Sequence, residues 1–265
     1  MCGLFGVIGN GIQRPDISIF RDLMVFSSVR GVDGTGFYIG NSRTNKGTLA
    51  KIGGDSVYFL ETLTREQENE LDKVTNNFFI GHTRFRTRGD GGLKGSQPFD
   101  TGGIVGTHNG TIDHDFEGYA SDSEKFLTNI AFAGPKAAAA KLLPKDAFAV
   151  VAYDKSKKDI LIMRNEKRSL YFALNKHRDV LYYASEAGFL YAALWRNGVE
   201  TPDGVSVFHP NVAYYFNPSD IVRKKRLYYR YLELSPPAVK ETTPVTTQTQ
   251  ESPTEKQNDA PPFDV

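Results

Sequence analysis

The sequence contains few residues that could cross-link the chain or hold a metal. It has one cysteine and five histidines in 265 residues. A single cysteine cannot form an internal disulfide, which excludes the disulfide-stabilised secreted domains. The histidines show no spacing typical of a zinc site, and one cysteine cannot complete such a site alone. We therefore expect no metal and no other cofactor.

Neither sign of charge is in excess, and long hydrophobic runs are missing. The 32 basic and 31 acidic residues give a formal net charge of +1 at pH 7. A balanced charge provides no global field that would attract nucleic acid or an anionic membrane. No apolar run reaches about eighteen residues, and no charged-then-apolar leader is present. We expect a cytoplasmic protein with no membrane or nucleic-acid partner.

The composition divides the chain into two parts. Hydrophobic residues make up 40% of the sequence and aromatic residues 12%, which is enough for a substantial core. Residues 235–265 are rich in proline, threonine and glutamine and have few apolar side chains, so they cannot offset the entropy of ordering. We predict a folded domain at 1–234 and a disordered tail at 235–265. The acidic end of the tail is also compatible with a short docking peptide.

Hydrophobic periodicity predicts an α+β domain with two strand-rich blocks separated and followed by helices. Strands are predicted at 4–8, 36–39, 48–52, 78–82, 104–108, 147–153, 160–164, 170–174, 180–184, 205–208 and 212–216. Helices are predicted at 15–30, 64–73, 123–133, 135–143 and 185–195. The basic residues 223–226, followed by tyrosines, suggest nucleic-acid binding superficially, but the neutral overall charge favours a solvated final strand or a partner-facing edge.

The single cysteine, Cys2, directly follows the initiator Met1. Removal of Met1, which a small second residue permits, would place a thiol and a free α-amine on one residue. An α-amine has an ordinary pKa of about 7.7–8.0, so it can take the thiol proton at neutral pH. Cys2 is therefore a candidate nucleophile with its own base. The alternative is a chance cysteine at a ragged terminus.

Four further segments favour the catalytic interpretation: residues 30–36, 81–89, 107–110 and 121–124. In this order, and together with the first six residues, they resemble the glutaminase domain of class II glutamine amidotransferases. This N-terminal-nucleophile type is found in glucosamine-6-phosphate synthase, glutamine phosphoribosylpyrophosphate amidotransferase, asparagine synthetase B and glutamate synthase. Residues 170–172 and 184–186 are similar to the second half of that family, and the resemblance covers roughly residues 2–220.

The resemblance implies a fold and a chemistry. The fold is the four-layer α/β/β/α sandwich of N-terminal-nucleophile hydrolases, with two antiparallel sheets face to face and helices outside. Cys2 would attack the side-chain amide of glutamine, while Asn109 and Gly110 would form the oxyanion hole. One such donor is typically worth about 2.7–4 kcal/mol of transition-state stabilisation. Taken alone, Asn109-Gly110 is also typical of a hairpin turn.

The family pattern also implies how the amino-acid head of glutamine is bound. Arg84 would bind the α-carboxylate with two parallel hydrogen bonds, and Asp122 would bind the α-ammonium. Thr87, in the same motif as Arg84, is included in the substrate site. The alternatives are a solvated surface arginine at position 84 and a helix N-cap at position 122.

Three residues are expected to support the site: Arg30, Asp33 and His108. Arg30 would position the terminal region, in a segment whose glycines allow the backbone to approach the N-terminus closely. Asp33 could equally be a turn residue. Residues 84–99 are rich in glycine and basic residues, which suits a lid that closes over glutamine. Family members commonly have tryptophan and histidine where this chain has Phe85 and Arg88, which leaves the details of the lid open.

The partner expected from the sequence is a second enzyme. The chain has no Walker A sequence, no Ser-Gly-Gly-x-Asp-Ser loop and no room for a sugar isomerase domain. We therefore expect ammonia to pass to a separately encoded synthetase or ligase. Two alternatives stay open: a stand-alone N-terminal-cysteine amidohydrolase acting on another small amide, and a glutamine-sensing or scaffold protein with little turnover.

Overall fold

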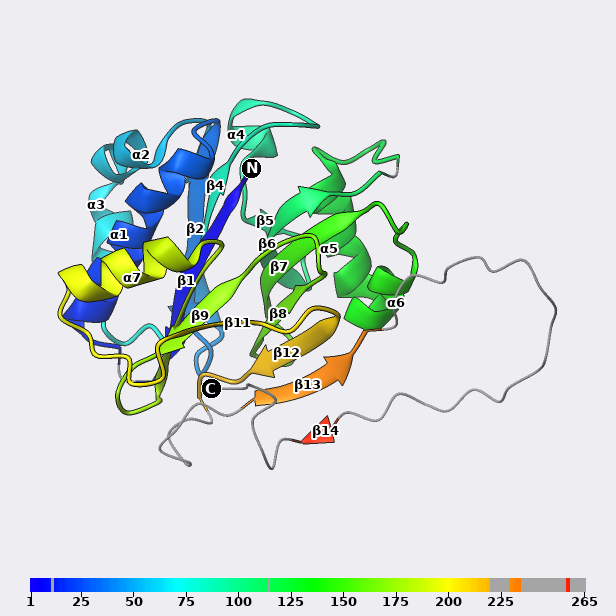
Figure 1. Ribbon diagram of the computed structural model, residues 1–265. Helices are drawn as coiled ribbons and strands as arrows, with labels where there is room; N and C mark the ends of the chain where they lie inside the picture. The colour runs from blue at the N-terminus through cyan, green and yellow to red at the C-terminus, as the bar shows by residue number, and fades with distance from the viewer. Residues whose placement is uncertain (11, 114, 220–228, 235–255, 258–265) are drawn as a thin grey trace.

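The structure is a computed structural model, and it describes residues 1–10, 12–113, 115–219, 229–234 and 256–257. Two seven-stranded sheets lie face to face, with helices on both outer sides (Figure 1). Every strand pairing is antiparallel. The predicted four-layer α/β/β/α sandwich with two antiparallel sheets is confirmed.

The first sheet contains the strand that begins beside the cysteine. Its strand order is β11-β9-β10-β1-β4-β2-β3. The bounds are β1 Gly3–Gly9, β2 Gly34–Asn41, β3 Lys46–Ile52, β4 Phe78–Arg84, β9 Tyr171–Leu174, β10 Val180–Ala184 and β11 Val205–Val207. The central strands β1 and β4 are buried along their whole length. The candidate nucleophile therefore precedes a strand that is buried along its whole length.

The second sheet contains the strand that holds Asn109 and Gly110. Its strand order is β14-β13-β12-β8-β7-β6-β5. The bounds are β5 Phe99–Asp100, β6 Ile104–Thr111, β7 Ala147–Asp154, β8 Asp159–Arg164, β12 Val212–Phe216, β13 Tyr229–Glu233 and β14 Lys256–Gln257. A strand follows the basic cluster as β13, but it pairs with both β12 and β14, so the expectation of a final or edge strand is wrong. The cluster itself, at 223–226, lies outside the described residues.

The helices cover the two outer faces of the sandwich (Figure 1). Their bounds are α1 Arg14–Ser27, the 3-10 helix η1 Ser28–Arg30, α2 Ser56–Thr62, α3 Arg65–Leu71, α4 Gly92–Gly95, α5 Asp122–Ala133, α6 Pro135–Ala140 and α7 Ala187–Arg196. Helices α1, α2 and α7 pack on the first sheet, where Phe20 contacts Phe5, Phe37 and Phe79. Helices α5 and α6 pack on the second sheet through Phe126, Leu127 and Ala138.

A third apolar cluster lies between the sheets and decides which way the site residues point. Leu4 and Ile8 of β1, Phe78 and Ile80 of β4, and Val105 of β6 all belong to it. Successive side chains of a strand point to opposite faces, so every second residue of these strands enters the space between the sheets. The hydrophobic pattern thereby fixes the direction of the polar residues that follow.

Most predicted elements are confirmed, with differences that have local causes. Helix α2 was not predicted, and it begins after Asp55, whose side chain accepts hydrogen bonds from the Val57 and Tyr58 amides. Helix α6 ends at Ala140, three residues before the predicted end. Strand β6 continues to Thr111, because Asn109 and Gly110 pair with Ala149 and Phe148 of β7. Within the predicted disordered tail, Lys256 and Gln257 pair with β13 as strand β14. Residues 235–255 and 258–265 lie outside the described residues, so the disorder expected there stays a prediction.

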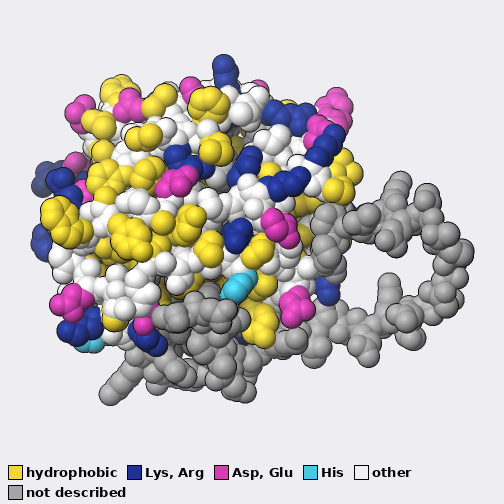
Figure 2. Space-filling view, viewed as in Figure 1, with side chains coloured by type: hydrophobic (Ala, Val, Ile, Leu, Met, Phe, Trp, Pro, Cys, Tyr) yellow, Lys and Arg dark blue, Asp and Glu magenta, His cyan; other side chains and the backbone are white. Residues whose placement is uncertain are grey.

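One outer face carries exposed aromatic side chains. Figure 2 shows hydrophobic side chains gathered where α7 lies, and this helix contains the exposed Tyr191 and Trp195. Trp195 is 86% exposed although it is the only tryptophan of the chain.

Among the described residues, no helix is long and apolar enough to cross a membrane.

Candidate active site

Strands β1 and β4 of the first sheet and β6 of the second direct polar side chains toward the same end of the space between the sheets. Strand β1 pairs with β4 in a register that joins Gly3 to Thr83, so Cys2 lies beside Arg84. By the alternation set by the buried core, Cys2, Arg84 and Asn109 all project between the sheets. Strand β6 packs against both β1 and β4. Residues from sequence motifs far apart are thus brought to one site.

The Cys2 thiol is held against the beginning of the predicted lid, residues 84–99. Its Sγ lies 3.6 Å from the Phe85 carbonyl oxygen and 3.4 Å from the Phe85 amide nitrogen, which donates to it. Burial raises the pKa of the Cys2 thiol, against the opposing effects of the Phe85 amide and nearby positive charges. The thiol is therefore protonated at neutral pH and needs a base at the moment of attack.

Arg30 contacts the backbone of the cysteine. Its Nε donates to the Cys2 carbonyl oxygen at 2.7 Å, and its Nη1 forms an ion pair with Glu186. Glu186 follows Ser185, whose hydroxyl accepts a hydrogen bond from the Leu4 amide at 2.9 Å. The segment after β10 therefore fixes both Arg30 and the start of β1. The family-like residues 184–186 contained the signal for this role.

Arg84 is buried, so the alternative of a solvated surface arginine is wrong. Its two terminal nitrogens donate to main-chain carbonyls of the lid, those of Arg88 at 2.9 Å and of Asp90. Burial lowers the pKa of Arg84, while the carboxylates of Asp33 and Asp122 favour its charged form. A guanidinium bonded in this way has the two-pronged geometry that a carboxylate requires, with carbonyl oxygens as its present acceptors.

Asp122 begins α5 but does not cap it. Ser121 is the N-cap residue, and its side chain accepts from the Glu124 amide. The carboxylate of Asp122 instead accepts from the Ile112 amide at 2.9 Å and from the Ser123 amide at 3.0 Å. The N-cap alternative for this residue is therefore wrong. Its negative charge favours the charged form of Arg84, the other residue expected to bind the amino-acid head.

Asn109 lies inside β6 and is buried, so the hairpin-turn alternative is wrong. Its Nδ2 is buried and has no hydrogen-bond partner among the described residues. Gly110 follows in the same strand and is partly buried. A buried N–H group without an acceptor costs roughly 1–3 kcal/mol, so it is typical of a position that a ligand oxygen fills.

His82 is a buried residue that the sequence analysis did not single out, although it belongs to the motif at 81–89. It pairs with Leu4 and faces the space between the sheets, like Arg84. Both ring nitrogens are buried and lack a partner among the described residues. Burial, reinforced by the positive charge of Arg84, lowers the pKa of His82 to about 3. Its neutral form is therefore present at all physiological pH values.

His108, the third supporting residue, points away from the cysteine toward α5. Its ring Nδ1 lies 2.8 Å from the Ser123 hydroxyl, and its Nε2 lies 3.4 Å from the Ala147 carbonyl oxygen. Burial lowers the pKa of His108. The side chain therefore ties β6 to the helix that begins with Asp122. Its backbone is bonded to Gln97, a lid residue that sequence reasoning missed.

The remaining two predicted residues lie on the exposed side of the site. Asp33 accepts a hydrogen bond from the Arg86 amide at 2.8 Å, so it holds the lid as well as its own turn. Thr87 is exposed on the lid. The adjacent Gly31 approaches β4 closely: a Cβ there would lie 2.2 Å from the Arg84 carbonyl carbon. The sequence analysis expected this segment to approach the N-terminus closely. Its glycine at position 31 instead approaches the backbone of Arg84, which lies beside Cys2.

Two cavities border this region. One, of about 830 Å³, lies on the outer side of the lid and is lined by Lys51, Leu93, Phe99 and Tyr119 among others. The other, of about 300 Å³, is lined by residues of α5, including Asp122, and by Ala138 of α6. Its lining includes neither Cys2 nor Arg84. In the part of the chain that the structure describes, no three acidic, histidine or cysteine side chains are grouped to hold a metal ion.

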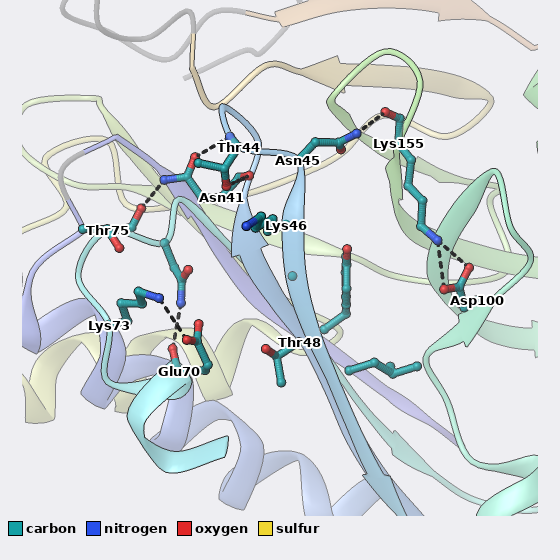
Figure 3. A pocket seen from close by; sticks show the side chains of 14 residues that line it. Asn41, Thr44, Asn45, Lys46, Thr48, Glu70, Lys73, Thr75, Asp100 and Lys155 are labelled. Atoms are coloured by element: carbon teal, nitrogen blue, oxygen red, sulfur yellow. Dashed lines mark hydrogen bonds and ion pairs between the residues drawn. The ribbon is translucent and has the colours of Figure 1, made fainter. Parts of the chain in front are cut away.

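A groove of about 750 Å³ lies at the turn between β2 and β3, and it is a weaker candidate (Figure 3). The polar side chains that line it bond to one another and to nearby backbone. Lys155 contacts both carboxylate oxygens of Asp100, at 2.8 and 2.9 Å, and Lys73 contacts Glu70. Asn45 donates to the Lys155 carbonyl oxygen. None of the residues that line the groove has a buried side-chain nitrogen or oxygen without a partner, unlike Asn109 and His82, so the groove does not resemble a reaction centre.

Comparison with known proteins agrees with the fold. No family model and no curated protein matches the chain. Among solved structures, a glutamine phosphoribosylpyrophosphate amidotransferase from B. subtilis, complexed with ADP and GMP, is 21% identical with a TM-score of 0.58. The match covers 82% of this chain and 48% of that chain. An allosteric regulatory enzyme of purine biosynthesis is 22% identical with a TM-score of 0.61, over 82% and 47% of the two chains.

A third solved structure, a glutamine aminotransferase class-II domain protein from Silicibacter pomeroyi, is matched over its whole length. It is 12% identical with a TM-score of 0.50, and the match covers 89% of this chain and 100% of that chain. The present chain spans about half the length of the first two proteins. Its described residues therefore adopt the fold of a class II, N-terminal-nucleophile glutamine amidotransferase domain.

Proposed function

We propose that the protein hydrolyses the side-chain amide of glutamine through a thioester on Cys2, giving glutamate and ammonia. The observation that carries the proposal is the convergence of Cys2, Arg84 and Asn109 at one end of the space between the sheets. The unpaired Nδ2 of Asn109 supports it further, because this donor is available to a developing oxyanion.

The chemistry begins after Met1 has been removed, which leaves the α-amine on Cys2. The amine takes the thiol proton as Sγ attacks the amide carbon of glutamine. The carbonyl oxygen becomes an oxyanion, stabilised by the Asn109 side chain and the Gly110 amide. The amine returns the proton to the nitrogen of the leaving group, the C–N bond breaks and ammonia departs. Water then attacks the thioester, releasing glutamate and restoring the thiol.

Substrate recognition is assigned to Arg84 and Asp122, with Thr87 at the lid. The α-carboxylate of glutamine would replace the lid carbonyls that now accept from Arg84. Because a carboxylate makes charge-assisted bonds to a guanidinium, it is a stronger acceptor than two neutral carbonyls. Binding of glutamine would therefore change the contacts of the lid, in keeping with a loop that closes over substrate.

The first test is glutamine turnover by Cys2 variants. Cys2→Ala should release no ammonia, and Cys2→Ser should lose nearly all turnover because a hydroxyl is a poorer nucleophile. Ammonia and glutamate are measured together, and thermal unfolding confirms that each variant is folded. Undiminished turnover by Cys2→Ala would place catalysis on another residue.

The proposal includes a separately encoded, ammonia-accepting synthetase in the cytoplasm, where a thiol stays reduced. The protein alone should hydrolyse glutamine slowly, and a partner found by co-purification should raise turnover when its own substrates are present. Fast turnover without any partner would favour the stand-alone amidohydrolase. An intact Met1 with negligible turnover would favour the glutamine-sensing protein.

The tail at 235–265 is proposed to tether that partner by raising its effective concentration. A chain ending at Leu234 should keep its basal turnover and lose stimulation at low protein concentration. Full stimulation of the shortened chain would eliminate the tether while leaving the glutaminase proposal intact.

A further inference from the structure

Gln97, at the end of the lid, bonds both backbone groups of His108. Its Nε2 donates to the His108 carbonyl oxygen at 3.1 Å, and its Oε1 accepts from the His108 amide at 2.7 Å. The Gln97 side chain is buried, so these bonds are shielded from water. A side-chain amide has one donor and one acceptor side, and here both are used on a single residue.

The Gln97–His108 contact takes up backbone groups on the edge of β6 that β5 leaves unpaired. Strand β5 pairs with β6 only through Phe99 to Gly106 and Asp100 to Val105. Beyond Gly106, the Gln97 amide takes the place of a strand residue at His108. The opposite side of β6 is paired with β7 through to Thr111. The backbone next to Asn109 is therefore held from both sides, and on one side the lid holds it.

The same end of the lid is fixed to the first sheet by independent contacts. Lys51 of β3 donates to the carbonyl oxygens of Ser96 at 2.8 Å and Pro98 at 3.3 Å. The Gly36 backbone packs directly on Gln97, where a Cβ would lie 2.3 Å from the Gln97 carbonyl oxygen. The packing of Gly36 on the Gln97 backbone does not involve Lys51, so we expect the Gln97 side chain to keep its place at His108 when only the Lys51 bonds are removed.

We propose that Gln97 is a positioning residue for the oxyanion donor Asn109: by fixing the backbone of β6 at His108, its side chain aligns the oxyanion hole. The inference rests on the proposed function of Cys2 and Asn109. With the Gln97 amide in place, β6 is fixed at His108 and the Asn109 side chain is held toward the cysteine. Without it, the edge of β6 at His108 loses both hydrogen bonds, and the donor is misaligned by a fraction of an ångström or more.

The central experiment compares Gln97→Met with Lys51→Met. Methionine keeps the length of the glutamine side chain but cannot make either bond, whereas Lys51→Met loosens the same lid end without touching β6. Misplacement of a catalytic group can cost up to about 100-fold in rate, so kcat of Gln97→Met should fall about 10- to 100-fold with KM within about threefold. Lys51→Met should change kcat by less than about threefold. Equal losses in both variants would overturn the proposal.

A transition-state analogue separates positioning from a merely structural role. Glutamate γ-semialdehyde adds to a thiol to give a tetrahedral oxygen, which the oxyanion hole would bind. Gln97→Met should weaken this inhibitor by the same factor as kcat/KM, while affinity for glutamine itself stays within about threefold. Equal weakening of both ligands would show that Gln97 only supports the fold.

A double-variant cycle tests the route through Asn109. In an Asn109→Ala background, Gln97→Met should have no further effect on kcat, because the donor it aligns is gone. The full 10- to 100-fold loss in that background would overturn the proposal. Hydrogen exchange at the His108 and Asn109 amides gives a readout that needs no turnover: it should accelerate in Gln97→Met and stay unchanged in Lys51→Met. If the wild-type protein shows no turnover, the proposed function fails, while exchange still decides whether Gln97 fixes β6.

Discussion

The two ends of the sandwich differ in how their polar side chains are satisfied. In the groove at the β2–β3 turn, Lys155 and Asp100 bond to each other and Asn41 donates to the Thr75 carbonyl oxygen (Figure 3). At the cysteine end, Asn109 and His82 bury nitrogens that have no partner among the described residues. Each such group lowers stability by roughly 1–3 kcal/mol. The far end is arranged for stability, whereas the cysteine end is arranged for a ligand.

Removing the unpaired donor should have the largest effect. Asn109→Ala should lower kcat by about 100- to 1000-fold with little change in KM, because the donor acts on the oxyanion and not on bound glutamine. The free energy of unfolding should not fall with it, since no hydrogen bond of Nδ2 is lost. Steady-state kinetics and urea unfolding check the two parts. A large loss of stability would show that Asn109 is a structural residue.

Weaker substrate binding is expected from changes at the head-group residues. Arg84→Lys should raise KM for glutamine by about 10- to 100-fold, because lysine provides one point charge where two parallel bonds are needed. Asp122→Asn should act in the same direction through the α-ammonium.

Glutarate monoamide, which lacks the ammonium, is the matched control for Asp122. Wild-type protein should hydrolyse it poorly, and Asp122→Asn should not reduce that rate further. If the monoamide is as good a substrate as glutamine for the wild type, Asp122 has been assigned the wrong role.

The buried, unpaired His82 predicts that the free energy of unfolding depends on pH. The pKa of His82 falls from its ordinary 6.5 to about 3 on folding, so below pH 6.5 the unfolded chain binds a proton that the folded chain does not. Stability should therefore decline as pH falls from about 6.5 toward 3, by up to about 1.4 kcal/mol per pH unit.

His82→Phe tests this decline, because it removes the titrating group and both unpaired nitrogens. Urea unfolding at pH 5 and pH 7.5 should show a smaller difference for the variant than for the wild type, with the remaining slope arising from other groups such as His108. An identical pH dependence in both proteins would contradict the depressed pKa.

The smallest effect is expected at the far groove. Lys155→Met removes a partly exposed ion pair with Asp100, and such pairs contribute about 0–1 kcal/mol. The free energy of unfolding should change by no more than that, and kcat and KM for glutamine should stay at wild-type values. A clear loss of glutamine turnover would mean that the two ends are not functionally separate.

The sequence predicted the elements of the fold better than the contacts of the site. The apolar residues of β1, β4 and β6 were sufficient to predict these strands, because a strand buried on both faces requires a short run of apolar side chains. It could not show that Asn109 lies within β6, since an Asn-Gly pair is locally compatible with a turn and only pairing with β7 decides. Nor could it identify Gln97. The side chain of Gln97 bonds the backbone of His108, and every residue type has the same backbone groups, so the sequence does not show which residue is the partner.

The most direct test of the account is the site of covalent labelling by a diazo-ketone analogue of glutamine. Intact-mass analysis of the purified protein should show that Met1 is absent and that one analogue molecule is attached. Peptide mapping should place it on Cys2, and an excess of glutamine should prevent the reaction. Labelling at another residue, or no labelling of folded protein, would contradict the claim that Cys2 is the nucleophile.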